Sequence, residues 1–252
     1  MDDGAIRSAA HASSDRANPG RTKIVIAIDG PAGSGKSTLA ALLARKYNYV
    51  NIETGAMYRA LALKAIEGSV AFDNGDKLAN LAEQSRIDLV PTADGNRVLL
   101  DGTDVTERLR SQDVTEAASR VSVHPPVREW MVDSQRKLGA GGGIVMEGRD
   151  IGTKVFPDAE VKIFLDAAPE VRGTRRFMQN PASEEHATAV LAELRARDQR
   201  DRQRANSPLV AASDAVQIDS TYLTLDQVLA RAIELVDAKL EEIAAKQNRH
   251  SR

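Results

Sequence analysis

The sequence of 252 residues contains no cysteine, almost no net charge and no long apolar segment. The absence of cysteine excludes disulfide bonds, thiolate zinc sites and cysteine nucleophiles, and it fits a reducing compartment. With 34 basic and 36 acidic residues, the chain has no global positive field that would attract nucleic acid or an anionic membrane. Any affinity for an anion must therefore come from a local cluster of charges.

No apolar run approaches the length of about 20 residues that a membrane span requires. Asp2 and Asp3 stand where a secretory signal peptide would be basic, so we expect no export and a cytoplasmic protein. Residues 1–20 are small, polar and aperiodic, a composition typical of a flexible tail. The sequence contains no internal repeat, and its length favours one α/β domain with smaller insertions.

Five short apolar runs, separated by helical stretches, predict the strands of a sheet. The first run, residues 24–28, is continuously apolar rather than alternating, as expected for a parallel strand that is covered on both faces. The other runs are residues 49–52, 143–147, 161–166 and 215–218. This alternation predicts an α/β fold with a doubly wound, five-stranded parallel sheet.

Two stretches interrupt the alternation of strands and helices. Within residues 72–122, the stretch IDLVPTADGNRVLLDGTDV alternates polar and apolar residues around the turn pairs Asp94-Gly95 and Asp101-Gly102, which predicts a small antiparallel β insert. Residues 170–204 predict a helix, a break at Asn180-Pro181 and a longer helix, together a helical lid. The expected organisation is a tail (1–20), three core segments (21–71, 123–169 and 205–252), the insert (72–122) and the lid (170–204).

The stretch GPAGSGKST matches the phosphate-binding pattern G-x-x-x-x-G-K-[ST], with a buried strand before it and a helix after it. Its glycines allow backbone N–H groups to turn toward phosphate oxygens, and the following helix directs its positive dipole end at the same anion. Lys36 supplies a cation, and Ser37 supplies an oxygen ligand for Mg²⁺. The residues predicted to bind ATP are Gly30, Pro31, Ala32, Gly33, Ser34, Gly35, Lys36, Ser37 and Thr38.

A second candidate ligand for the metal is Asp166, at the end of the apolar run VKIFLD. An acidic residue in this place can hold the metal in phosphate-loop proteins. A carboxylate that ends a buried strand is also a common cap of a helix or turn. Both interpretations stay open at this point.

Surplus arginines indicate a kinase rather than a simple NTPase, because a kinase needs a second pocket for a charged acceptor. Arg59 follows the second predicted strand and Arg149 follows the third, so both reach the carboxyl edge where ligands bind in open α/β sheets. This edge suits phosphoryl transfer, in which cations stabilise the transition state. One face of a predicted helix carries a further group, Arg197, Arg200, Asp201 and Arg204. The alternative for that face is a solvated surface with ion pairs such as Arg197 with Asp201.

Six ordered blocks of the chain resemble the bacterial cytidylate kinase family: IDGPAGSGKST, TGAMYRALAL, AASRVSVHPPVR, GRDIGTKVFPDA, KIFLDA and RDQRDRQR…PL. The resemblance covers residues 22–238, whereas the phosphate loop alone would also fit shikimate, gluconate or adenylate kinases. It implies transfer of the γ-phosphate of ATP, bound with Mg²⁺, to CMP and dCMP without a covalent enzyme intermediate. It also implies that the β insert binds the nucleoside monophosphate. We expect a monomer with no nucleic-acid or membrane partner.

Carried over position by position, the resemblance implies three groups of acceptor residues. Those that hold the acceptor's phosphate are Arg59, Arg149 and Arg204. Those that lie along its sugar are Tyr58, Arg197 and Asp201. Those that face its base are Ser119, Arg128 and Asp150. Cytosine suits the last group, because its amino group donates to a carboxylate while its O2 and N3 accept hydrogen bonds.

The resemblance assigns further roles. Thr54 stands in the acceptor site where the family also has serine, and Glu147 stands where some members have aspartate. The expected catalytic residues are Lys36, Arg149 and Arg204. Residues 172–187 resemble the family's mobile lid, whose arginines could close on the phosphates of ATP; these are Arg172, Arg175 and Arg176.

Plainer roles stay open for several of these residues. Ser119 could be a small packing residue, Tyr58 a core aromatic, and Arg128 a surface charge. Asp150 could merely orient Arg149 through an ion pair. At the level of function, the alternatives are a kinase of the same fold for another acceptor, such as UMP or shikimate, and a nucleotide-dependent switch protein without a second anion pocket.

Overall fold

The computed structural model describes residues 21, 23–92, 95–179 and 184–250, so the predicted tail, Asp94 and the break at Asn180-Pro181 lie outside the described residues. Five strands form a parallel sheet in the order β2-β6-β1-β7-β8. They are β1 (Val25–Asp29), β2 (Val50–Glu53), β6 (Ile144–Gly148), β7 (Val161–Asp166) and β8 (Val216–Asp219). Each predicted strand lies within one residue of its expected position, and the five-stranded parallel sheet is confirmed.

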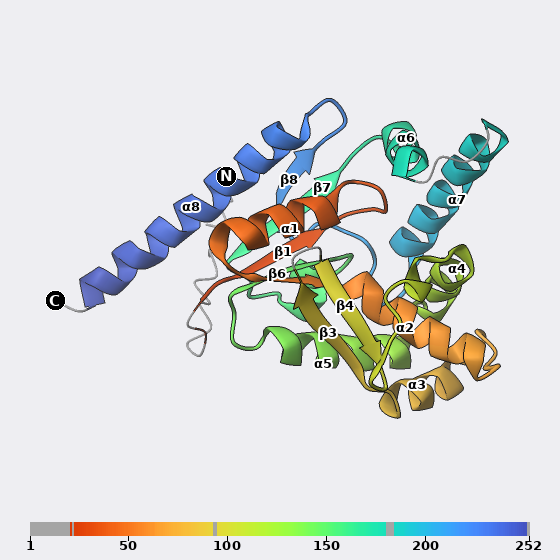
Figure 1. Ribbon diagram of the computed structural model, residues 1–252. Coiled ribbons are helices and arrows are strands. Elements are labelled where there is room, and N and C mark those ends of the chain that lie inside the picture. The colour runs from red at the N-terminus through yellow and green to blue at the C-terminus, as the bar shows by residue number, and fades with distance from the viewer. Residues whose placement is uncertain (1–20, 22, 93–94, 180–183, 251–252) are drawn as a thin grey trace, which may run out of the picture.

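Helices cover both faces of the sheet, which makes it doubly wound as predicted (Figure 1). On one face, α1 (Lys36–Tyr47) and α8 (Leu225–His250) pack through Leu39 and Val228 against the strands. On the other face, α5 (Pro125–Gly139) and the π-helical turn η2 (Ile151–Val155) pack against β1 and β6. Every residue of β1 is buried, which explains its continuous apolar sequence.

The segment between β2 and α5 forms a second group of elements beside the sheet. It contains α2 (Thr54–Glu67), α3 (Gly75–Glu83), β3 (Ile87–Thr92), β4 (Gly95–Leu100), β5 (Thr103–Asp104), the 3-10 turn η1 (Arg108–Arg110) and α4 (Gln112–Val121). β4 pairs antiparallel with both β3 and β5, so the predicted antiparallel insert is confirmed. The helices of this segment share an apolar core with α5, in which Leu61, Leu78, Val121 and Met131 are buried.

Two helices follow β7 and pack on each other, as the predicted lid requires. They are α6 (Pro169–Gln179) and α7 (Glu184–Gln203). Gly173 permits the close packing, because a Cβ at this position would lie 3.3 Å from the side chain of Leu191. No helix within the described ranges is both long enough and apolar enough to span a membrane.

Candidate functional site

The phosphate loop joins β1 to α1 at the carboxyl edge of the sheet. Gly30 lies so close to β7 that a Cβ would overlap the carbonyl oxygen of Leu165, and its φ of 148° is also one that other residues rarely adopt. Lys36 is buried, and its Nζ donates a hydrogen bond to the carbonyl of Pro31 at 2.6 Å. Ser37 Oγ donates to Glu147 Oε1 at 3.1 Å. The loop therefore places an ammonium group and a hydroxyl group beside the end of β6.

Two pockets adjoin this loop. The arginine pocket lies between α2, α4, α7 and the end of β6, and every predicted acceptor residue lines it: Thr54, Tyr58, Arg59, Ser119, Arg128, Arg149, Asp150, Arg197, Asp201 and Arg204. The loop pocket is lined by residues 33–38 of the loop, by α6 and by the segment around the start of α8. Residues that line both pockets are Gly33, Lys36, Ser37 and Arg176. Gly30 and Pro31 line neither pocket and lie at the base of the loop.

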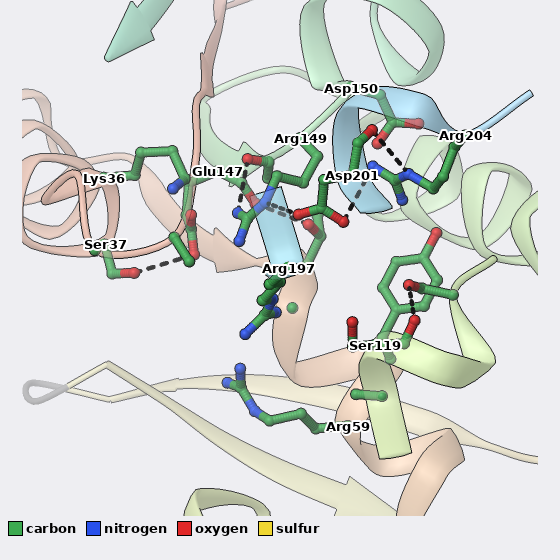
Figure 2. A pocket seen from close by; sticks show the side chains of 18 of the residues that line it. Lys36, Ser37, Arg59, Ser119, Glu147, Arg149, Asp150, Arg197, Asp201 and Arg204 are labelled. Carbon is green, nitrogen blue, oxygen red and sulfur yellow. Dashed lines mark hydrogen bonds and ion pairs between the residues drawn. The ribbon is translucent and has the colours of Figure 1, made fainter. Parts of the chain in front are cut away.

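Figure 2 shows the arginine pocket with Lys36 and Ser37 at one end. In its middle, Arg59 and Arg197 point their guanidinium groups toward each other. Within the described part of the chain, Arg197 has no ion pair, and the single ion pair of Arg59 is a long one of 3.9 Å to Glu53. Arg149 is better neutralised, because its Nε lies 2.9 Å from Asp201 Oδ2. The middle of the pocket thus holds more positive than negative charge.

Burial and the surplus of positive charge lower the pKa values of three of the pocket's cations. Burial, followed by repulsion from Arg149, lowers the pKa of Lys36 to about 7. The same two causes lower the pKa of Arg197 to about 10, and burial lowers the pKa of Arg59 as well. A bound anion would relieve this repulsion and form charge-assisted hydrogen bonds with the guanidinium groups. The middle of the pocket therefore suits a phosphate group.

The other end of the pocket offers polar groups of a different kind. Arg128 and Asp150 form a buried ion pair, with 2.5 Å between Nη2 and Oδ2, and the guanidinium carbon lies 5.6 Å from the ring centre of Tyr58. Burial raises the pKa of Tyr58 to about 12, so its hydroxyl stays protonated. Ser119 is buried beside them. A carboxylate, a guanidinium and a hydroxyl at one place can recognise the edge of a planar base.

This end of the pocket decides two of the open alternatives. Arg128 is not a surface charge, because its side chain is 4% exposed. Asp150 does not orient Arg149 through an ion pair, since it pairs with Arg128 while Arg149 pairs with Asp201. Thr54 has an additional structural role, as its Oγ1 donates to the backbone carbonyl of Glu147 at 2.8 Å.

Glu147 is the residue near the loop that sequence reasoning left without a role. β6 lies next to β1 in the sheet, so the side-chain carboxylate of Glu147, near the end of β6, reaches Ser37. Asp166 ends β7 on the other side of β1, where its Oδ1 accepts from the N–H of Ala167 and its Oδ2 lies 3.6 Å from Arg202. The structure therefore favours the capping interpretation of Asp166, and it places Glu147 where a metal could be held.

The donor set at Ser37 and Glu147 fits Mg²⁺ that arrives with a nucleotide. Within the described residues, no group of three or more His, Asp and Glu side chains could hold a metal by itself. Mg²⁺ in phosphate-binding sites is commonly held by one or two protein oxygens together with oxygens of the substrate. The hydroxyl of Ser37 and the carboxylate of Glu147, whose oxygens lie 3.1 Å apart at the phosphate loop, provide two such protein oxygens.

Asp29 is a second residue that the sequence analysis missed. Its carboxylate accepts hydrogen bonds from the N–H groups of Ile151 and Gly152 at 2.8 and 2.7 Å. Burial raises its pKa to about 7. Asp29 thus ties the end of β1 to η2, which directly follows Asp150. The signal in the sequence was an acidic residue immediately before the phosphate loop.

The lid arginines do not form one set. Arg172 is 1% exposed, and its guanidinium binds two backbone carbonyls and Asp198. Arg175 donates to the hydroxyl and the carbonyl of Ser220 at 3.0 and 2.7 Å. Arg176 lines both pockets. The suggestion that the lid arginines could close on the phosphates of ATP therefore does not fit Arg172 in this structure, because its donors face the protein's own atoms.

The predicted arginine face of α7 also needs a correction. Arg197 and Asp201 line the arginine pocket, but Arg200 is exposed and does not. α7 ends at Gln203, so Arg204 reaches the pocket from beyond the helix. Asp201 pairs with Arg149 and Arg204 rather than with Arg197, so the alternative of a solvated helix with an Arg197–Asp201 pair does not hold.

Comparison with known proteins connects this geometry to a family. The model of the family described as cytidylate kinase matches residues 26–238. The chain is 48% identical over 219 residues to the cytidylate kinase of Enterococcus faecalis, covering 86% of this chain and 97% of that protein. It is 47% identical over 220 residues to the cytidylate kinase of Geobacillus thermodenitrificans, covering 86% and 98%. A solved structure from Eubacterium ventriosum is a more distant likeness, with a TM-score of 0.45 and 15% identity over 85% of this chain and 99% of that one.

Proposed function

The chain belongs to the cytidylate kinase family of ATP-dependent phosphotransferases, and on that premise we propose that it transfers the γ-phosphate of ATP to CMP, giving ADP and CDP. One observation carries the proposal: the predicted acceptor residues gather in a pocket that shares Lys36 and Ser37 with the loop pocket. An ATPase would need a single nucleotide site. Two pockets with common cations at their boundary suit the transfer of a phosphoryl group from one ligand to another.

ATP would bind with its phosphates on the loop and its base and ribose in the loop pocket. Beyond the loop, most of the residues that line that pocket are apolar, as a base requires. The apolar ones are Leu39, Leu165, Met178, Leu223, Leu225 and Val228, and the polar ones are Arg175, Arg176 and Ser220. Sequence reasoning did not assign the apolar residues, because the stretch STYLTL carries no recognisable motif.

CMP would occupy the arginine pocket with its phosphate in the middle and its base at the far end. Arg59, Arg149 and Arg197 surround the middle, which supports Arg197 as a phosphate ligand rather than a sugar ligand (Figure 2). Arg204 and Asp201 lie farther along, toward Asp150, and so nearer the sugar and base. Asp150 would accept from the amino group of cytosine while Arg128 and Ser119 donate to its O2 and N3.

The chemistry that this arrangement supports is positioning and charge stabilisation, with no covalent enzyme intermediate. Lys36 and Arg176 stand at the boundary of the pockets, where charge on the transferred group can be neutralised. Arg149 would hold the acceptor so that its phosphate oxygen lies in line with the donor. Ser37 and Glu147 would hold Mg²⁺ together with phosphate oxygens, and the ion would supply further neutralisation of the donor's charge.

Three finer properties belong to the proposal. dCMP is expected as a second acceptor, because most of the groups assigned above contact the phosphate or the base, which CMP and dCMP share. A monomer is expected, because one chain supplies both pockets. A cytoplasmic location would provide both ATP and CMP.

A survey of acceptors tests the proposed function. ADP formation would be measured with ATP, Mg²⁺ and, in turn, CMP, dCMP, UMP and AMP. We expect rapid turnover with CMP and dCMP and much slower turnover with the others. Faster turnover with UMP would indicate another acceptor, and ATP consumption that no monophosphate accelerates would contradict a kinase. The same survey with Lys36→Ala protein identifies activity that comes from contaminating kinases.

A further inference from the structure

Arg172 is a fully buried arginine that touches neither ligand pocket, and its contacts join three separate parts of the site. Its Nε donates to the carbonyl of Ala167 at 2.8 Å, just before α6. Its Nη1 donates to the carbonyl of Ala32, in the phosphate loop, at 3.0 Å. Its Nη2 lies 2.6 Å from Asp198 Oδ2, on α7. One guanidinium thus binds the phosphate loop and a lid helix at the same time.

The contact with the phosphate loop holds the peptide group between Ala32 and Gly33, and Gly33 lines both pockets. In a trans peptide, the carbonyl of one residue and the N–H of the next point in opposite directions. A carbonyl of Ala32 held by Arg172 therefore directs the N–H of Gly33 away from α6. Arg175 makes a similar but longer contact of 3.4 Å to the carbonyl of Ser34. Gly33 also packs directly on α6, since a Cβ there would lie 3.1 Å from the carbonyl oxygen of Arg172.

The contact with α7 acts on the arginine pocket. Asp198 follows Arg197 in the chain and precedes Asp201 by less than one helical turn, and both of these neighbours line the pocket. The side chain of Asp198 is 11% exposed, and its Oδ1 is buried without a hydrogen-bond partner among the described residues. The Arg172 ion pair is therefore its main anchor, and a shift of Asp198 would move Arg197 and Asp201 with it.

We propose that Arg172 is a positioning residue that joins the phosphate loop to α7 and so keeps the donor and acceptor sites in one relative geometry. The inference rests on the proposed function and deepens it. Arg172 lines neither pocket, so its replacement removes no group that lines a ligand's site, and we expect each ligand still to bind. Transfer is more sensitive, because misplacement of reactants by about 1 Å can reduce the rate by about 10²-fold.

The chain contains a matched control for the Arg172–Asp198 pair. Arg195 and Glu170 also connect α7 with α6, with 2.5 Å between Nη2 and Oε1, but both side chains are more than half exposed and neither lines the arginine pocket or the loop pocket. Arg195→Ala removes a contact between the same two helices without touching the phosphate loop. This control therefore distinguishes the effect of loosening α6 from α7 from the effect of loosening these helices from the phosphate loop.

The test compares Arg172→Lys and Arg195→Ala with the wild-type enzyme. Lysine keeps a positive charge near Asp198 but loses the planar fork that reaches both carbonyls. We expect Arg172→Lys to lower kcat at least about tenfold, while Kd values for ATP alone and CMP alone change by less than about threefold. Arg195→Ala should change none of these quantities. A folded Arg172→Lys enzyme with wild-type kcat would overturn the proposal, as would a loss of ATP affinity equal to the loss of kcat.

A second measurement does not depend on catalysis. Amide hydrogen exchange in α7 should be faster in Arg172→Lys than in the wild type, and unchanged in Arg195→Ala. Unchanged exchange in Arg172→Lys would contradict the proposal even if the enzyme used another acceptor, whereas failure of wild-type protein to phosphorylate CMP would contradict only the proposed function. If Arg172→Lys does not fold, Asp198→Asn decides, with the same expected loss of kcat and faster exchange in α7.

Discussion

On the donor side of the site, one uninterrupted loop carries the phosphate-binding groups, whereas on the acceptor side the lining residues come from α2, α4, α5, the end of β6 and the end of α7. The loop relies on backbone N–H groups and one lysine. The acceptor side relies on long charged side chains, several of which pair with each other. A site that binds its ligand through backbone N–H groups tolerates side-chain changes at many positions. A site that binds through side chains depends on each of those side chains and on its partner.

The two sides also differ in the number of charged side chains that they contain. Residues 33–38 of the loop include a single charged side chain, Lys36. The arginine pocket contains Glu147, Asp150 and Asp201 among its cations, so each guanidinium is either paired or left for a ligand. Although burial raises the pKa of Asp201, Arg149 and Arg204 lower it below its ordinary value, so this carboxylate stays charged and keeps Arg149 in place.

The largest expected effect is at Lys36, which lines both pockets. Lys36→Ala should lower kcat by about 10²–10³-fold, because this cation is worth most where charge develops in the transition state. Steady-state rates and a melting curve for the same preparation check the prediction. Wild-type turnover from the folded variant would mean that the two pockets do not share a catalytic group.

Arg197 tests whether the acceptor side works independently of the donor side. Arg197→Ala should raise the KM for CMP about 10- to 100-fold, since loss of a hydrogen bond to a charged group costs about 1.5–3 kcal/mol. The Kd for ATP alone should stay unchanged. Arg200→Ala is the matched control, because Arg200 lies on the same helix but is exposed and outside the pocket. Equal effects of the two variants would show that only general charge matters.

Asp150 tests the specificity of the far end of the acceptor side. Asp150→Asn should lower the ratio of kcat/KM for CMP to that for UMP at least about tenfold, equivalent to about 1.4 kcal/mol. A carboxylate only accepts hydrogen bonds, whereas asparagine can turn an amino group toward O4 of uracil. Glu129→Gln, an exposed change beside Arg128, serves as the control. If both acceptors lose activity equally, Asp150 acts only as the partner of Arg128.

The smallest expected effect is on the free energy of unfolding, and it tests how strongly burial and the nearby arginines lower the pKa of Lys36. Because the pKa of Lys36 is about 7 in the folded protein and higher in the unfolded chain, the unfolded state binds more protons between pH 7 and 10. The free energy of unfolding of the ligand-free enzyme should therefore rise with pH in this range. Relative to Lys36→Ala, the gain from pH 7 to 9 should be about 2 kcal/mol.

Denaturant titrations of both proteins at the two pH values measure that difference. Asp29 titrates near pH 7 with the opposite sign, since its raised pKa makes the folded state bind more protons than the unfolded chain. Subtracting the Lys36→Ala values removes most of that contribution. If the free energy of unfolding of the wild type relative to Lys36→Ala fell as the pH rose, the pKa of Lys36 would not be lowered in the folded protein.

Sequence reasoning predicted the strands and the lining of the arginine pocket well, because both depend on local patterns or on the resemblance of ordered blocks. It left open which partner a charged side chain takes when several candidates lie at very different distances along the chain. Asp150 is adjacent to Arg149, yet it pairs with Arg128, while Arg149 pairs with Asp201, 52 residues away. Likewise, nothing local distinguishes Arg172, which is buried, from Arg176, which lines both pockets.

The sequence by itself determined the phosphate loop and the parallel strands, because a glycine pattern and a continuous apolar run specify backbone conformation and burial within a few residues. Tertiary structure alone decided which acidic residue meets Ser37. Glu147 lies near the end of β6 and Asp166 ends β7, and the strand order places these two strands on either side of β1. In the folded protein Ser37 meets Glu147, 110 residues away, while Asp166 caps a turn. Strand order arises from packing over the whole domain, so no short stretch of sequence contains it.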